Sequence, residues 1–360
     1  MDGFSLIPTP DTLPAPWWIF EALDLITFVV HILLVNLVVG GSLLVLYARV
    51  RGRDPGGTDS LAGAVFKKIP VAIALGVNFG VAPLLFVQVL YGHLIYSSSV
   101  LMATYWILVV PLLILAYYGA YIYTRRHPLT GGLSVAALLL SVAVLLYIAF
   151  VFVNNMTLYL HPEKWTAYFE ERQGTLLNVG DPTLWPRFLH FLAAAVAVAG
   201  LFSAFVWSRR RKEDAAVVST HVRSGLRVFA WGSAVQIAVG LWLLVSIPSD
   251  LRSLFMGGNG LYTGFFPIGM GLGIAAMASG FAGKLKSTGI LLLLTVVCMV
   301  LVRSFLRTAY LGRFFQVESL KLVPQYGVMA LFFAVFVVGM AVVGYMVKTA
   351  LAAEKREVVR

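Results

Sequence analysis

Three histidines lie in or beside long apolar stretches of the sequence, where an ionisable side chain is costly and is a candidate for function. His31 lies inside the first apolar run, His93 closes the second, and His190 lies near the start of the fifth. Imidazole nitrogens are common axial ligands of haem iron, so these residues predict a haem between membrane helices. A membrane histidine also serves often as a plain interhelical hydrogen-bonding group, and that alternative stays open.

Other residues near these histidines fit the remaining needs of a haem. Met270 is a further candidate ligand, because haem iron accepts His/Met ligation, although most membrane methionines only pack. Arg187, Arg303 and Arg307 are candidates to contact the propionates. The small residues after His190, AAAVAVAG, would let a flat macrocycle approach the backbone.

Histidines in the connections have a simpler interpretation. We expect His127, His161 and His221 to be solvated surface residues. The single cysteine, Cys298, excludes an intrachain disulfide and the two-cysteine attachment motif of a c-type haem.

The elements that must position these residues are membrane helices. Hydrophobic residues make up 60% of the chain and charged residues 12%, with a mean hydropathy of +0.88, which excludes an ordinary soluble domain. Each transmembrane helix needs about 20 apolar residues. The sequence therefore predicts an all-α, polytopic membrane protein of about nine transmembrane helices, over residues 22–48, 66–92, 102–124, 131–153, 188–208, 224–247, 264–283, 287–306 and 326–349.

The distribution of positive charge predicts the topology. Nineteen of the 27 Lys and Arg residues fall in alternate connections and the C-terminal tail. We expect an extracytoplasmic arm over residues 1–21, a membrane domain over 22–350 and a cytoplasmic tail over 351–360. The net charge of +11 is thus mainly a topology signal, and the absence of a folded basic domain argues against nucleic-acid binding. The predicted location is a bacterial inner membrane.

Several helical segments, in their order along the chain, are similar to one known family. These are LDLITFVVHILLVNLVVGGSLL, KKIPVAIALGVNFGV, LSVAALLLSVAVLLYIAFVFVNNMTLYLHP, WPRFLHFLAAAVAVAGLFSAFVWSRR, GFFPIGMGLGIAAMASG and RTAYLGRFF. Together they resemble the first, second, fourth, fifth, seventh and eighth helices of subunit I of the cytochrome bd quinol oxidases. The resemblance spans nearly the whole chain.

The resemblance implies roles for particular residues. It places a ligand of the high-spin haem pair at His31 and a ligand of the low-spin haem b at His190. The family's methionine ligand falls at Gly269 or, with a shift of one residue, at Met270. His93 has no counterpart among the family's ligands; if the high-spin pair is remodelled, it would pair with His31 or meet a haem of a partner subunit. Depth argues against the first option, because His31 lies about 15 Å into the bilayer at 1.5 Å per residue and His93 near its surface.

The chain also departs from the family. Its third helix, YWILVVPLLILAYYGAYIY, has no acid, and its eighth, VLVRSFLRTAYLG, has Arg and Ala where the family has a ligating glutamate. The long quinol-binding loop between helices six and seven is missing. An oxygen-reducing site needs a carboxylate that delivers protons, so the resemblance implies the fold and a b-type haem more strongly than it implies oxygen reduction.

The leading functional hypothesis is a haem-b electron-transfer subunit that works between the quinone pool and a periplasmic partner such as a c-type cytochrome. The alternatives are a bd-type terminal oxidase subunit and a haem-free anchor or transporter. Quinone or a partner would meet the aromatic residues Trp165, Tyr168, Trp185 and Phe188, although interfacial aromatics are usually a membrane belt.

Overall fold

Nine helices in the described part of the chain are long and apolar enough to cross a membrane, which confirms the predicted all-α polytopic architecture. The structure is a computed structural model and describes residues 3–52, 60–125, 132–170, 172–210 and 213–359. The spans are α1 (Trp17–Val50), α2 (Ile69–Leu101), α3 with α4 (Ala103–Ile107 and Val109–Arg125), α5 (Gly132–Tyr159), α6 (Leu184–Ser208), α7 (Ala215–Ser246), α9 (Gly260–Phe281), α10 (Leu285–Leu311) and α11 (Tyr326–Val359).

Short elements cap the ends of these spans. They are the 3-10 helices η1 (Gly3–Leu6), η2 (Leu61–Ala64), η3 (Phe66–Lys68), η4 (Pro162–Phe169) and η6 (Val317–Ser319), the helix α8 (Ser249–Ser253) and the π-helical turn η5 (Leu254–Gly258). The one β-bridge recorded in the described ranges joins Leu13 to Leu322.

Several helices extend beyond their apolar runs. The clearest case is α2, which continues past His93 to Leu101, so the prediction that His93 closes this helix is wrong. Hydropathy detects only the apolar part of a helix, whereas serine hydroxyls support its polar continuation: Ser97 donates to the carbonyl of His93 (2.8 Å) and Ser98 to that of Ile95 (3.0 Å). The helix kinks at Tyr91, whose φ and ψ are −128° and 22°.

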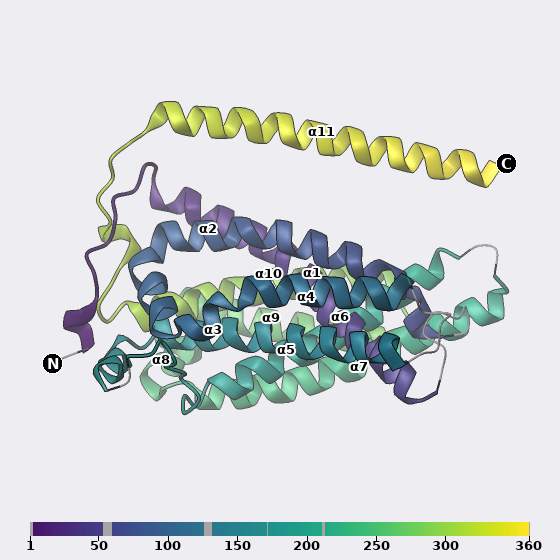
Figure 1. Cartoon of the computed structure of the whole chain (residues 1–360), viewed down its shortest axis with the longest axis horizontal. Coiled ribbons are helices and arrows are strands. Elements are labelled where there is room, and N and C mark those ends of the chain that lie inside the picture. The colour runs from purple at the N-terminus through teal and green to yellow at the C-terminus, as the bar shows by residue number, and fades with distance from the viewer. Residues whose placement is uncertain (1–2, 53–59, 126–131, 171, 211–212, 360) are drawn as a thin grey trace.

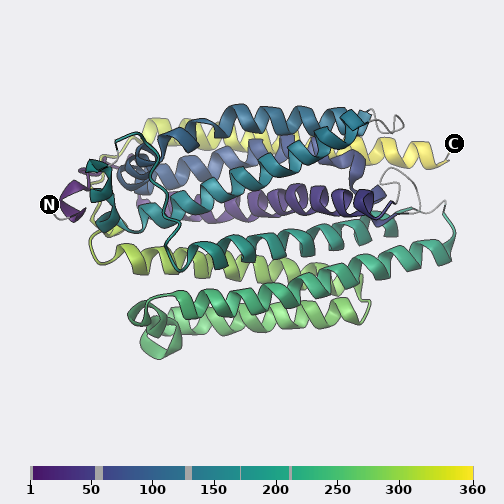
Figure 2. The ribbon, with the colours of Figure 1, turned by 60° about the horizontal axis from the view of Figure 1, so that its bottom comes forward.

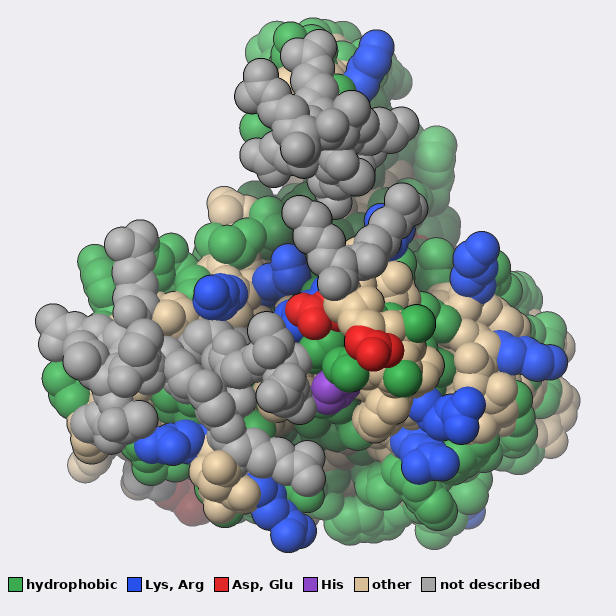
Figure 3. Space-filling model, turned by 90° about the vertical axis from the view of Figure 1, so that its right-hand side faces the viewer, with side chains coloured by type: hydrophobic (Ala, Val, Ile, Leu, Met, Phe, Trp, Pro, Cys, Tyr) green, Lys and Arg blue, Asp and Glu red, His purple; other side chains and the backbone are tan. Residues whose placement is uncertain are grey.

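Consecutive helices pack as antiparallel pairs: α1 with α2, α4 with α5, α6 with α7, and α9 with α10. Figures 1 and 2 show these pairs side by side along the long axis of the molecule. We call the end where α1, α4, α6 and α9 finish the basic end. Lys and Arg side chains are spread over this whole face, and the few visible acidic side chains lie near its middle (Figure 3).

A close backbone approach brings α1 against α6. A Cβ atom added to Gly40 would lie 1.9 Å from the carbonyl oxygen of Ala195, so the two backbones touch. A similar approach joins α6 to α7, where a Cβ on Gly225 would lie 2.6 Å from the carbonyl oxygen of Gly200. Membrane helices pack closely through small residues in this way, because lipid supplies no hydrophobic force between them.

The last helix, α11, lies apart from the other spans (Figure 1), and none of its apolar window is buried. Its start is held at the end opposite the basic end by the N-terminal arm. There the N–H of Leu13 donates to the carbonyl of Lys321 (2.8 Å) and the N–H of Val323 donates to that of Leu13 (2.8 Å).

Replacement of Gly40 by alanine is expected to force α1 and α6 apart and to destabilise the bundle by about 1–3 kcal/mol or more through overpacking. Gly41→Ala is the matched control, because the nearest atoms to its Cβ lie at an ordinary 3.9 Å. Both changes add similar helix propensity. Thermal unfolding in detergent, followed by size-exclusion chromatography, measures the difference. Equal stability of the two variants would show that this contact does not control assembly.

Candidate functional site

His31 is held against α2. Its Nδ1 lies 3.0 Å from the carbonyl oxygen of Gly76, and its ring rests on Gly80, where a Cβ would lie 2.5 Å from Cε1. A carbonyl can only accept, so Nδ1 carries the proton and Nε2 keeps its lone pair. Only glycine at position 80 leaves room for the ring.

His190 is held against α7 in the same manner. Its Nδ1 lies 3.1 Å from the carbonyl oxygen of Gln236, and a Cβ on Gly240 would lie 3.1 Å from its Cε1. The side-chain amide of Gln236 donates to Nε2 at 3.3 Å. The lone pair of Nε2 therefore accepts a long, weak hydrogen bond from this amide, which a metal ligand bond could replace.

The two histidines thus share one local arrangement. Each ring binds a backbone carbonyl on the next helix and packs on a glycine four residues, about one turn, further along. Gly40 lies nine residues after His31 and Ala195 five after His190, and these two residues touch. Since α1 and α6 run in the same direction, His31 lies about 6 Å nearer the end opposite the basic end, at 1.5 Å per residue.

Arg303, on α10, is the cation nearest to His31 among the predicted site residues. Its guanidinium stacks over the ring of Phe28 at 4.1 Å, and the centroid of that ring is 6.2 Å from the His31 ring. No carboxylate or hydrogen-bond partner of Arg303 is found among the described residues. An unpaired guanidinium at membrane depth is expensive, which makes it a candidate to bind an anion.

Arg307, one turn further along α10, is already paired. Two of its nitrogens donate to Oδ2 of Asp24 at 3.1 Å, and both side chains are 3% exposed. Its guanidinium also lies over the ring of Tyr91, at 4.5 Å. Next to it, Ser304 donates to a carboxylate oxygen of Glu21 at 3.0 Å. These two acids on α1 were not singled out by the sequence reasoning, although the position of Asp24 in the first apolar run was a signal. Glu21 fell in the predicted arm, because α1 begins earlier than its apolar run.

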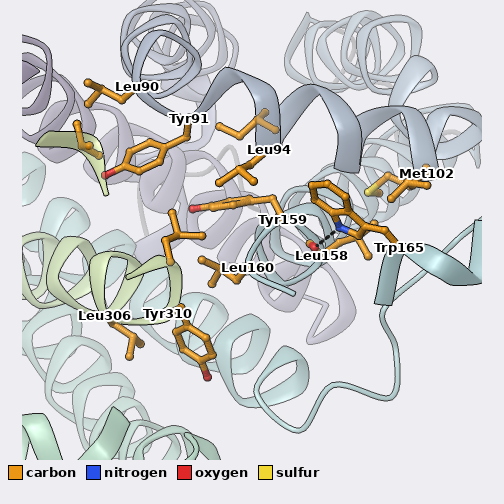
Figure 4. Packing of buried hydrophobic residues seen from close by; sticks show 14 of the residues in the cluster. Leu90, Tyr91, Leu94, Met102, Leu158, Tyr159, Leu160, Trp165, Leu306 and Tyr310 are labelled. Atoms are coloured by element: carbon orange, nitrogen blue, oxygen red, sulfur yellow. Dashed lines mark hydrogen bonds between the residues drawn. The ribbon is translucent and has the colours of Figure 1, made fainter. Parts of the chain in front are cut away.

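Arg187, Arg303 and Arg307, which we call the arginine cluster, lie within electrostatic range of one another although they come from two helices. Arg187 donates through Nε to the hydroxyl of Thr183 (3.1 Å). Its Nη2 and the hydroxyl of Tyr310 make no bond of good geometry in the described structure, but the two side chains lie close enough to interact with each other. The Nε of Arg307 and the hydroxyl of Tyr91 are also buried without a hydrogen-bond partner there. Figure 4 shows these two tyrosines within the apolar cluster at this end of the bundle.

The unsatisfied donors around the three arginines carry a free-energy cost that a bound acceptor would remove. Each buried donor without an acceptor costs about 1–3 kcal/mol, and native proteins contain few of them. Asp24 accepts from Arg307 and Glu21 accepts from Ser304. Asp181 is joined to Arg187 through the hydroxyl of Thr183, which donates to Asp181 and accepts from Arg187. The site therefore has spare N–H donors for an anionic group.

The other predicted ligands lie on α9 and α2. Met270 is on α9, which packs on α7 and α10, and α7 is also the helix whose Gln236 carbonyl contacts His190. His93 lies 13 residues beyond Gly80 on α2, so about 20 Å of helix separates it from His31 and the two cannot share an iron. Its Nε2 is buried without a partner, and its ring lies edge-on to Phe315 at 4.6 Å.

The connection after α5 closes the end of the bundle above the arginine cluster. Trp165 is buried, 2% exposed, and donates to the carbonyl of Leu158 (3.0 Å, Figure 4), so it is core rather than the predicted quinone or partner surface. Its predicted companion Trp185 is exposed, and its ring lies tilted against Phe150 with the centroids 5.8 Å apart. Trp165 is buried because it lies in η4, a short helix that hydropathy alone does not predict.

His161 is partly buried, with 14% of its side chain exposed, contrary to the prediction of a solvated residue. Its Nδ1 lies 3.2 Å from the carbonyl of Thr157, and its Nε2 is 3.6 Å from Asp181. Asp181 accepts from the N–H and hydroxyl of Thr183 (2.8 and 2.6 Å) and from Lys164 (3.3 Å). Burial lowers the pKa of His161. Burial alone would raise the pKa of Asp181, but the Thr183 hydrogen bonds bring it below its ordinary value.

His221 lies at the basic end, where its ring stacks on Trp207 at 4.0 Å. His127 falls outside the described residues. Within the described ranges no three His, Cys, Asp or Glu side chains form a metal site. A haem iron does not need such a group, because the protein supplies only its axial ligands.

Comparisons with protein families, with curated proteins and with solved structures found no match to this chain. The resemblance to bd oxidase subunit I therefore stays a prediction that rests on the quoted segments.

Replacement of Asp24 by asparagine is expected to leave Arg307 as an uncompensated buried charge and to cost about 3–5 kcal/mol of stability. The double variant Asp24→Leu/Arg307→Met removes both charges and should recover most of this loss, because an apolar pair of similar size avoids the desolvation penalty. Thermal unfolding of the purified variants measures both effects. If the double variant is no more stable than Asp24→Asn, the ion pair is not what the single change disrupts.

Acid is expected to open the connection around η4. Between the ordinary histidine pKa of about 6.5 and its lower value in the folded protein, the opened segment binds a proton at His161 that the folded segment does not. Stability is therefore full above that range and falls as the pH drops through it. The pKa of Asp181 is also lowered, so protonation of this carboxylate at lower pH further reduces the stability of the folded connection.

Hydrogen-exchange protection factors for residues 160–170 at pH 7.5 and 5.5 test this expectation. His161→Asn keeps a hydrogen-bonding side chain but cannot titrate here, so its protection should change much less between the two pH values. The same loss in both proteins would exclude His161 as the cause.

Proposed function

We propose that this chain is a membrane-embedded electron-transfer subunit of a respiratory oxidoreductase and holds b-type haem. The observation that carries the proposal is the combination of two oriented imidazoles with a cluster of arginines that keeps buried N–H donors without acceptors among the described residues. Both features lie in the part of the bundle remote from the basic end. Electrons would pass there between the quinone pool and a periplasmic partner such as a c-type cytochrome.

The residues present fit a haem in two ways. At His31, the carbonyl of Gly76 sets the tautomer that leaves Nε2 free, which is how second-shell groups orient ligating histidines. At His190, the amide of Gln236 occupies the ligating nitrogen and would have to give way. A bound haem supplies one-electron redox chemistry, and its potential depends on axial ligand, burial and nearby charge.

The arginine cluster would bind the propionates. Arg303 has no acid partner among the described residues, and Arg187 has a spare buried donor, so both suit a carboxylate better than Arg307, which Asp24 already holds. These side chains would orient the macrocycle and favour the more negative oxidation state of the site. Met270 and His93 remain candidate ligands of a haem at another position, His93 with a buried nitrogen that has no partner.

We further propose that the N-terminus is outside and the C-terminus cytoplasmic in a bacterial inner membrane. The gathering of Lys and Arg at the basic end supports this orientation through the positive-inside rule (Figure 3). The haem region would then face the periplasm, on the side where a c-type cytochrome and released protons are found.

Alanine replacement of His31 or His190 is expected to remove most of a b-type haem from the purified protein, because each variant loses an axial ligand. His221→Ala is the control, since it removes an imidazole stacked on Trp207 at the basic end. Haem per protein, from the pyridine haemochrome and the reduced-minus-oxidised spectrum, is the measurement.

Unchanged spectra in both histidine variants would overturn the ligand assignment. Wild-type protein without a Soret band would support a haem-free anchor or transporter. Carbon monoxide binding together with oxygen consumption would support the bd-type oxidase alternative over an electron-transfer subunit.

A further inference from the structure

A cavity of about 660 Å³ opens at the basic end, between the end of α6 and the turn that joins α9 to α10. Its lining residues are Ser208, Arg209, Lys284, Leu285, Lys286 and Ser287. Three of the six are cations, two are hydroxyl donors and none is acidic. The cations and hydroxyls can bind an anionic group with several oxygen acceptors, such as a phosphate, while most of the surface of this open hollow is apolar.

The three cations have no carboxylate partner among the described residues. Arg209 lies over the ring of Phe205 at 4.6 Å, a contact that leaves its N–H groups free. The Lys and Arg side chains elsewhere on this face do not line the cavity. Asp214, one of the acids of this end, caps α7 by accepting from the N–H of Ala216 (2.7 Å) and is not part of the lining.

The backbone of the turn adds to the positive character of the cavity. Gly283, at φ 75°, ends α9 and lets α10 begin two residues later. Lys284 caps α10 without a side-chain hydrogen bond, so the first N–H groups of that 27-residue helix are free at the cavity. The positive end of the helix dipole reinforces the attraction of an anion there.

Apolar side chains continue from the cavity along the membrane-facing surface. Lys286 begins a row on α10 at helical spacing, followed by Ile290, Leu293 and Val297, each exposed. On α6 the exposed Phe205 lies one turn before Arg209. Both helices therefore present cations at the membrane edge and apolar groups next to them. A phospholipid has the same order, with an anionic headgroup at the edge and an acyl chain next to it.

We propose that this cavity is a binding site for an anionic phospholipid, with the phosphate held by Arg209, Lys284 and Lys286 and an acyl chain along the α10 row. Basic pockets between membrane helices bind anionic headgroups by this chemistry. A bound lipid would connect α6 to the α9–α10 pair, which lacks a long interface with α6. The proposal does not depend on haem.

The test compares wild-type protein with Arg209→Gln/Lys284→Gln/Lys286→Gln. The control, Arg51→Gln/Lys67→Gln/Lys68→Gln, removes the same charge from the same end outside the cavity. Retained lipid is counted by native mass spectrometry, and the melting temperature is followed, in detergent with phosphatidylglycerol, phosphatidylcholine or inorganic phosphate. We expect phosphatidylglycerol to bind and stabilise the wild type and the control, and to bind the cavity variant about tenfold or more weakly.

Three results would overturn the proposal: equal lipid retention by all three proteins, equal loss in the control, or stabilisation by inorganic phosphate as large as that by phosphatidylglycerol. Stabilisation by phosphatidylcholine equal to that by phosphatidylglycerol would overturn the requirement for an anionic headgroup. If the triple variant does not fold, two other variants replace it. Lys286→Gln should weaken lipid binding. The charge-preserving variant should retain it; this is Arg209→Lys/Lys284→Arg/Lys286→Arg.

Discussion

The contact between Gly40 of α1 and the backbone of Ala195 on α6 is the constraint on which the arrangement of the site depends. It joins two antiparallel helix pairs, α1 with α2 and α6 with α7. In each pair, a histidine of the first helix contacts a backbone carbonyl of the second. Because the two helices run in the same direction and touch at a fixed level, the separation of His31 and His190 along the bundle is set by chain geometry. A larger residue at position 40 would change that separation.

The hydrogen bond from each histidine to a backbone carbonyl replaces the water that a membrane interior lacks. An imidazole nitrogen at this depth must find a protein acceptor or bear a large cost. In both cases a helix carbonyl is that acceptor, and a glycine one turn further along admits the ring. The same requirement makes the arginine cluster unusual, because several of its donors have no acceptor in the described structure. Asp24 is hydrogen-bonded to Arg307, whereas Arg303 stacks on the face of Phe28 and makes no recorded hydrogen bond to an acid among the described residues.

Charge also organises the opposite face of the molecule. The lysines and arginines that orient the chain in the membrane are mostly dispersed, yet three of them meet at one cavity beside the start of α10. A topology signal can therefore coincide with a binding site when helix ends bring cations from distant segments together. The detached α11, held at its start through Leu13, completes the predicted set of spans without packing its apolar window on the bundle.

The nine spans, their order and the separation of charge could be predicted from the sequence, because each depends on local composition within about 20 residues. The histidines and the three arginines could be singled out for the same reason: an ionisable residue in an apolar run stands out. Hydropathy could not find the true ends of α2 or α11, since hydroxyls and helix propensity extend a helix past its apolar part.

Tertiary structure alone decided which residues meet. It paired Asp24 with Arg307 across 283 positions, buried Trp165, and set His161 against Thr157 and Asp181. Such contacts depend on helix rotation, depth and close backbone approach, which arise from packing between segments far apart in the chain and leave no periodic signal within any one of them.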